Sequence, residues 1–255
     1  MSSPTTAAHR AGPSLRSLLD AAARGDFPPA DGTVTFVSQP SARDAGVIAF
    51  TAHTVVFADI ADASGTAGTS GTAGTSGTAG TAGTAECPAS EGTGAGLRAL
   101  LPPDDLSAPL NPPFLTALCA RTGRVVNNLD LLALAAPLPG PPPLPLTETT
   151  DRSHPRIVRA LQHRDDVRAW TAPGGTVLIG RGVAGRWETA VEVDPDARGK
   201  GLGRLLALAA RHLVPDGAPL WAQIAPGNAA SVRAFLAAGF APVGAEALLV
   251  PPTRP

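Results

Sequence analysis

The stretch that decides the fold reads WETAVEVDPDARGKGLG and runs from Trp187 to Gly203. Its first part, up to Val193, has the composition of a β-strand, and the apolar spacing after it predicts a helix over residues 201–213. The junction holds three glycines and two cationic side chains, Arg198 and Lys200. Because a helix N-terminus presents free backbone N–H groups and favours negative charge, this junction predicts a phosphate-binding site.

Two common glycine-rich phosphate sites do not fit this junction. A P-loop needs a serine or threonine after its lysine, whereas Lys200 is followed by Gly201 and Leu202. A dinucleotide fingerprint needs Gly-x-Gly-x-x-Gly, whereas the glycines here are spaced Gly-x-Gly-x-Gly. The pattern that does fit is Arg198-x-x-Gly201-x-Gly203 directly after a strand.

A second motif lies further along the chain. Asn228 has the side chain of an N-cap, and the apolar stripe after it predicts a helix over residues 229–238. Gly239 is a typical helix stop, and Phe240 follows it. Residues 240–250 then predict a final pair of strands.

Together, the two motifs resemble those of the GNAT superfamily of acyl-CoA-dependent N-acyltransferases, over about residues 144–250. The resemblance implies an α/β fold with a mixed, mostly antiparallel central sheet flanked by helices. It also implies transfer of an acetyl group from acetyl-CoA to a primary amine by direct attack, without a covalent enzyme intermediate. Either motif alone would be weak, but their order and their placement on the predicted elements make the pair specific.

The resemblance also implies where CoA binds. Backbone amides from Gly199 to Arg204 would hold the pyrophosphate, the strand before them would pair with the pantetheine arm, and Asn228 would contact that arm from the second helix. The implied cofactor-binding residues are Val191, Val193, Arg198, Gly199, Lys200, Gly201, Leu202, Gly203, Arg204 and Asn228.

Two glutamates are the candidates for the general base that the attacking amine needs. Glu188 lies on the strand where many relatives carry a glutamate, and Glu192 is the second candidate. Strand alternation places both side chains on one face. For Glu188 the structural alternative is an ion pair with Arg186.

Phe235 occupies the position where the family often has a tyrosine that protonates the departing thiolate. The sequence contains no tyrosine at all. Either the thiolate leaves unassisted, or a water or another group serves, or the domain does not catalyse. The alternative function is therefore a non-catalytic acyl-CoA-binding regulatory module; a protein-interaction domain with a vestigial site is a third.

Composition divides the chain into four parts. Residues 1–31 read as a tail and a short helix, and residues 32–136 as an N-terminal α/β domain that contains a flexible Gly-Thr-Ala/Ser repeat at 64–85. Residues 137–143 form a proline-rich linker, and residues 144–255 the acetyltransferase domain. We expect the N-terminal domain to supply a wall of the acceptor site, and it could be a degenerate copy of the same fold.

Charge and hydropathy narrow the classes of partner that the protein is expected to have. A net charge of -1 and a pI of about 6.5 argue against nucleic acid. No apolar run reaches the roughly 18 residues of a membrane span, and no signal peptide is visible, so a cytoplasmic location is expected. Scattered histidines predict no metal site. The expected partner is a small-molecule or peptide amine, with a homodimer left open.

One basic helix face allows two interpretations. Arg156, Arg159 and His163 share a face of the helix predicted over residues 155–163. Such a face is usually solvated, and the alternative is a site for an acidic substrate.

Overall fold

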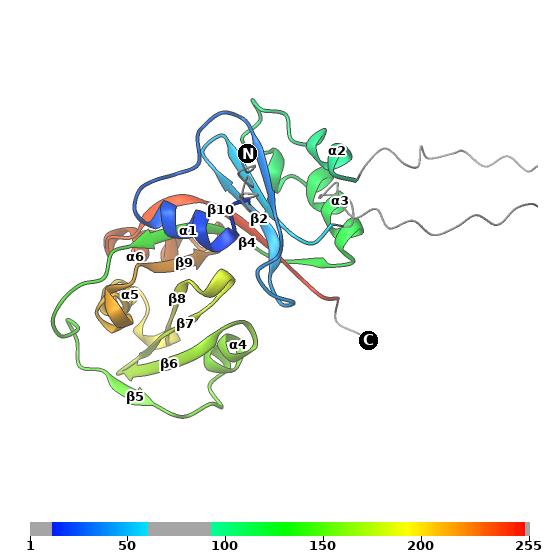
Figure 1. The fold of residues 1–255 in the computed structure, drawn as a ribbon. Helices are drawn as coiled ribbons and strands as arrows, with labels where there is room; N and C mark the ends of the chain where they lie inside the picture. Colours follow the sequence, from blue (N-terminus) through cyan, green and yellow to red (C-terminus); the bar gives the residue numbers. More distant parts are fainter. Residues whose placement is uncertain (1–11, 61–92, 253–255) are drawn as a thin grey trace, which may run out of the picture.

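The protein is described by a computed structural model over residues 12–60 and 93–252 (Figure 1). The repeat predicted at 64–85 and residues 1–11 of the predicted tail lie outside these residues. The strands are β1 (Val34–Val37), β2 (Ala45–Phe50), β3 (His53–Phe57), β4 (Val125–Ala135), β5 (Thr147–Thr149), β6 (Asp165–Ala172), β7 (Gly175–Arg181), β8 (Trp187–Val193), β9 (Leu220–Ile224) and β10 (Ala241–Val250). The α-helices are α1 (Leu15–Ala23), α2 (Thr93–Arg98), α3 (Pro112–Thr122), α4 (Pro155–His163), α5 (Leu202–Leu213) and α6 (Ala229–Ala237).

The described strands form one ten-stranded sheet in the order β1-β3-β2-β10-β4-β9-β8-β7-β6-β5. Its pairs are antiparallel except for β1 with β3 and β8 with β9. The predicted mixed, mostly antiparallel sheet flanked by helices is therefore confirmed.

Helices cover both faces of this sheet. Within β7, Val177 packs with α5 and α6, whereas the next residue, Leu178, packs with α4. Within β2, Val47 packs with α2 and α3, whereas Ile48 packs with α1. Since neighbouring strand residues point to opposite faces, α5 and α6 lie opposite α4, and α2 and α3 lie opposite α1.

The two halves of the sequence share the sheet. β10, from the C-terminal half, lies between β2 and β4 of the N-terminal half, and β4 in turn pairs with β9. The predicted final strand pair is wrong in one respect, because residues 241–250 form one strand whose register shifts twice along β4. The division into two domains, and the idea that the first is a degenerate copy of the second, stay predictions.

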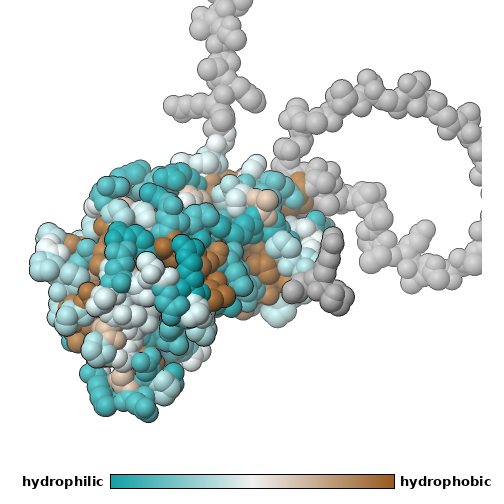
Figure 2. Space-filling model, turned by 90° about the horizontal axis from the view of Figure 1, so that it is seen from below, coloured by the Kyte–Doolittle hydropathy of each residue, from teal (hydrophilic) through white to brown (hydrophobic). Residues whose placement is uncertain are grey.

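Two features bear on membrane association: the polarity of the surface and the length and apolar character of the helices. Seen from below, the surface is mostly hydrophilic, with hydrophobic residues in small areas between (Figure 2). Scattered exposed apolar side chains of this kind are normal for a folded domain. Within the described ranges, no helix combines the length and apolar character that crossing a bilayer would require.

Candidate functional site

The site begins where two neighbouring strands part. β8 and β9 pair in parallel only from Trp187 to Thr189, against residues 220–222 of β9. β8 remains paired with β7 on its other side as far as Val193. From Ala190 onward, β8 therefore has an edge without a strand partner among the described residues, and such an edge can pair with an extended ligand.

A cleft of about 500 Å³ opens beside this edge. Residues of β8, β9 and α6 line one part of it, including Val191, Asn228 and Phe235. The N-terminal half lines another part through residues 43–45 and 127–130, and α4 lines a third. The cleft thus has walls from both halves of the sequence, which is the arrangement expected if the N-terminal half helps to bind the acceptor.

The glycine junction follows β8 directly. A short 3-10 turn, η3 (Pro195–Ala197), leads into it, and α5 begins at Leu202. Gly199 and Gly201 have φ angles of 74° and 84°. Glycine adopts this left-handed region without the steric cost of a side chain. The positive φ at these two positions explains why the junction needs glycine there, and it brings backbone amides to the start of α5.

The two cationic side chains of the junction fold back onto its backbone. Arg198 Nε donates to the carbonyl of Val193 at 3.2 Å, and Lys200 Nζ donates to the carbonyl of Asp196 at 2.9 Å. At Gly203, a Cβ would make only ordinary van der Waals contacts, with Val193 at 3.5 Å and Ala234 at 3.8 Å, so packing does not require glycine there. Two positive charges therefore lie at the N-terminus of α5, where the helix dipole already favours an anion.

The cleft gathers some of the sequence-predicted residues and not others. Glu188, Val191 and Asn228 line it, whereas Glu192, Val193 and residues 198–204 do not. Asn228 caps α6 through its oxygen, which accepts from the amide of Ser231 at 3.0 Å. Its side-chain amide nitrogen is then the group that can donate a hydrogen bond to a ligand.

Glu188 is held by two arginines. It is 2 % exposed; its Oε1 accepts from Arg186 Nε at 2.8 Å and from the amide of Val183 at 3.2 Å, and its Oε2 accepts from Arg164 Nε at 2.9 Å. Burial by itself would raise the pKa of Glu188, but the charges of Arg186 and Arg164 outweigh it and lower that pKa below its usual value. The two arginines thus favour the ionised carboxylate, which makes Glu188 a weak proton acceptor.

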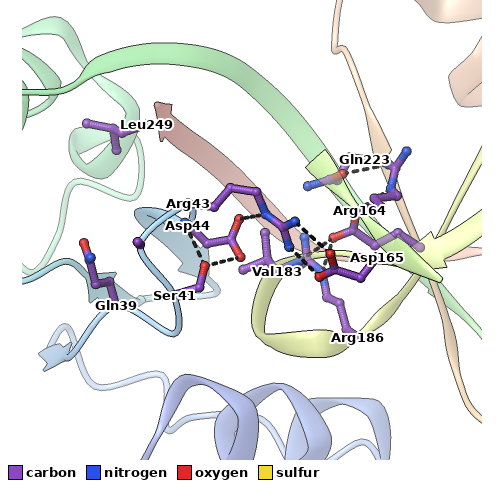
Figure 3. Close-up of polar contacts among 12 residues, drawn as sticks. Gln39, Ser41, Arg43, Asp44, Arg164, Asp165, Val183, Arg186, Gln223 and Leu249 are labelled. Carbon is purple, nitrogen blue, oxygen red and sulfur yellow. Dashed lines mark hydrogen bonds and ion pairs between the residues drawn. The ribbon is translucent and has the colours of Figure 1, made fainter. Parts of the chain in front are cut away.

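These contacts close into a ring of five side chains, of which Glu188, Arg186 and Glu246 are buried; Figure 3 labels Arg164, Arg186 and Gln223. Arg186 Nη2 also contacts Glu246 at 2.8 Å, Gln223 Nε2 donates to Glu246 at 2.6 Å, and Arg164 Nη2 donates to Gln223 at 3.3 Å. Burial raises the pKa of Glu246, and nearby Glu188 adds to this, despite the opposing charge of Arg186. The ring joins β8, β9 and β10 to the C-terminal end of α4.

Glu192 lies on the same face as Glu188. Its Oε2 accepts from Arg156 Nε of α4 at 3.1 Å, and both side chains are partly exposed. Because Glu188 also contacts Arg164, which follows α4, both glutamates face this helix, as strand alternation predicts.

Asp130 is a cleft residue that the sequence reasoning missed. It is 6 % exposed on β4 and stands directly opposite Glu246 of β10. Burial raises the pKa of Asp130, and the bond from Asn128 and the charge of Arg159 only partly offset this. The signal in the sequence was a single acidic residue within the apolar run from Leu129 to Ala135.

Phe235 lies in the cleft, as its place in the second motif predicts, and is 4 % exposed. Its ring packs edge-to-face on Phe240 with centroids 5.0 Å apart. It offers no proton donor to a leaving group. In the described residues, no three histidine, cysteine or acidic side chains are grouped so as to hold a metal ion.

Comparison with known proteins agrees with the motifs. Residues 141–240 match the family model of the Acetyltransferase (GNAT) family. No curated protein matches the sequence at a significant level.

Three solved structures are similar to parts of the chain. The first is a GCN5-related N-acetyltransferase from Kribbella flavida, with 19 % identity and a TM-score of 0.37, and the match covers 56 % of this chain and 65 % of that one. The second is a GNAT-family protein from Novosphingobium aromaticivorans, with 17 % identity and a TM-score of 0.37, and the match covers 51 % of this chain and 69 % of that one. The third is a tandem GNAT protein from the clavulanic acid biosynthesis pathway, with 16 % identity and a TM-score of 0.34, and the match covers 57 % of this chain and 61 % of that one. The chain thus covers between 61 % and 69 % of the length of these structures. By the family match, the C-terminal half of this chain, over residues 141–240, is a GNAT acetyltransferase domain.

Proposed function

We propose that the protein transfers an acetyl group from acetyl-CoA to the primary amine of an acceptor by direct attack on the thioester. The observation that carries this proposal is the parting of β8 and β9 immediately before the glycine junction. An open strand edge suits the amide-rich pantetheine arm, and a helix N-terminus suits the pyrophosphate. Both features lie on consecutive segments, as one extended ligand requires.

CoA would be held mainly by backbone groups. Val191 and Val193 would pair with the pantetheine arm, Asn228 would contact it from α6, and the amides of residues 199–204 would bind the pyrophosphate. Arg198 and Lys200 lie at the same helix end and add positive charge there.

The reaction needs a proton acceptor in the cleft. The amine nitrogen attacks the carbonyl carbon of the thioester, a proton passes from nitrogen to a carboxylate, and the C–S bond then breaks to release the CoA thiolate. Glu188 and Glu192 are the bases expected from sequence, and Asp130 joins them. We rank Asp130 first because its pKa is raised, whereas two arginines hold the pKa of Glu188 low.

The test is release of free thiol from acetyl-CoA with a panel of amines, together with calorimetric titration of CoA. Amine-dependent thiol release supports the proposal. Tight CoA binding without turnover of any amine would instead support the regulatory module, which the missing proton donor at Phe235 favours. Absence of binding would contradict both.

Replacing one glycine tests the pyrophosphate site. Gly201→Ala is expected to weaken CoA binding about tenfold and to lower the free energy of unfolding by about 1–2 kcal/mol, because alanine is strained at a φ of 84°. Gly217→Ala is the matched control, since Gly217 also has a positive φ and open space around it but lies outside the junction. Calorimetry and urea unfolding should show a similar stability loss for both variants. Equal CoA affinity in both would contradict the assigned site.

A further inference from the structure

We propose that the acceptor amine also carries a carboxylate, which Arg159 binds, while the amino group lies at Asp130. This inference rests on the proposed acetyl transfer. It concerns the part of the cleft between α4 and β4, away from the glycine junction.

The basic face of α4 turns toward the cleft rather than toward solvent alone. Arg156, Arg159 and His163 all line the cleft, and Arg43 of the N-terminal half lines it as well. Burial lowers the pKa of His163, and the charges of Arg159, Arg164 and Arg43 lower it further. Burial and these charges therefore disfavour the protonated form of His163 in this part of the cleft.

Most of these cations already have a carboxylate partner. Arg43 contacts both Asp44 and Asp165, as Figure 3 shows, at 3.1 Å and 3.2 Å. Arg156 is paired with Glu192, and Arg164 with Glu188, as described above. Their charges are neutralised within the fold.

Arg159 differs from its neighbours. Within the described residues, its guanidinium has no carboxylate partner and donates only to the neutral amide oxygen of Asn128, at 3.3 Å. It is exposed, so a ligand can reach it without breaking an ion pair. A guanidinium offers a planar fork of donors that matches an anionic group with paired oxygens, such as a carboxylate.

Arg159 and Asp130 lie close enough to interact. Asn128 links the two: it accepts from Arg159 at 3.3 Å and also bonds to Asp130, and the charge of Arg159 lowers the pKa of Asp130. Arg159 comes from α4 and Asp130 from β4, and both line the cleft. A molecule with an ammonium and a carboxylate close together, such as an amino acid, would satisfy both groups at once.

The test uses the full chain, saturating acetyl-CoA and a panel of amino acids, each paired with its α-carboxamide. The amide keeps the shape and removes the charge. For the preferred amino acid we expect kcat/KM to exceed that of its amide by about 10- to 100-fold, as a charge-assisted bidentate contact allows. Arg159→Gln should bring this ratio close to one through KM, and Arg159→Lys should retain part of it.

Arg152→Gln is the control, because Arg152 is an exposed arginine just before α4 that does not line the cleft. It should keep the wild-type ratio. Equal use of acids and amides by the wild type, an unchanged ratio in Arg159→Gln, or preference for phosphate-bearing amines would overturn this inference alone. Binding of CoA without turnover of any amine would overturn the proposed function and this inference with it.

Discussion

Asp130→Asn is expected to lower kcat by about 10²- to 10⁴-fold with little change in CoA affinity, the usual effect of removing a general base. Asparagine keeps the size of the side chain but cannot accept the proton. Asp130 lines the cleft, whereas residues 198–204 of the glycine junction do not, so the donor site should remain intact. Steady-state thiol release and calorimetric titration of CoA measure the two effects separately.

Asp44→Asn is the control for this variant, because Asp44 is another carboxylate of the cleft lining but is engaged by Arg43. It should keep most of the activity. If Asp130→Asn stays within a few-fold of wild type while Glu188→Gln loses turnover without losing CoA, the base is Glu188 instead.

The pH profile separates the same two candidates. A base works only when deprotonated, so kcat/KM falls as the pH drops through its pKa. The pKa of Asp130 is raised, which places this fall above the usual aspartate range, whereas the pKa of Glu188 is lowered, which would place it below the usual glutamate range. Asp130→Asn should abolish the acid limb of the profile. An unchanged limb in that variant would rule out Asp130 as its source.

Arg186→Met is expected to lower the free energy of unfolding by about 3–5 kcal/mol, because it leaves buried carboxylates without their partner. The Arg186 side chain is 3 % exposed and contacts both Glu188 and Glu246 within the ring. Water cannot replace it easily at that depth. Urea unfolding followed by circular dichroism measures the loss.

Arg168→Met provides a matched comparison on the surface. Arg168 also forms an ion pair, with Glu148 at 2.9 Å, and it also lies over a tryptophan, as Arg186 does. Because this pair is about half exposed, its loss should cost about 0–1 kcal/mol. Similar losses in the two variants would show that the ring contributes no more than an ordinary surface pair.

Local signals predicted the turn and the helix ends of the two motifs. The glycines of the junction, the N-cap at Asn228 and the stop at Gly239 act within a few residues of themselves, so their effect can be read from sequence. The ion pair of Glu188 with Arg186 was also foreseeable, since the two are close in sequence. Arg164, the other partner of Glu188, lies on a different element and gave no such signal.

The rest of the site depends on contacts between residues that are far apart in the sequence. Nothing local to Asp130 or Glu246 indicates that their strands lie side by side, because the register of β4 with β10 depends on the whole sheet. For the same reason, the sequence favoured a solvated face for the arginines of α4. Only the packing of α4 beside residues from β4 makes them part of a cleft.

The position of β10 has a consequence for how the chain is made. β10 is the last of the ten described strands to be synthesised, yet it fills the gap between β2 and β4. Until residues 241–250 emerge, both of those strands keep a bare edge, and the walls of the cleft are not yet joined. Bare edges invite pairing with other chains, and distant pairings form slowly. The nascent protein therefore passes through an interval in which its sheet is in two pieces and open to association.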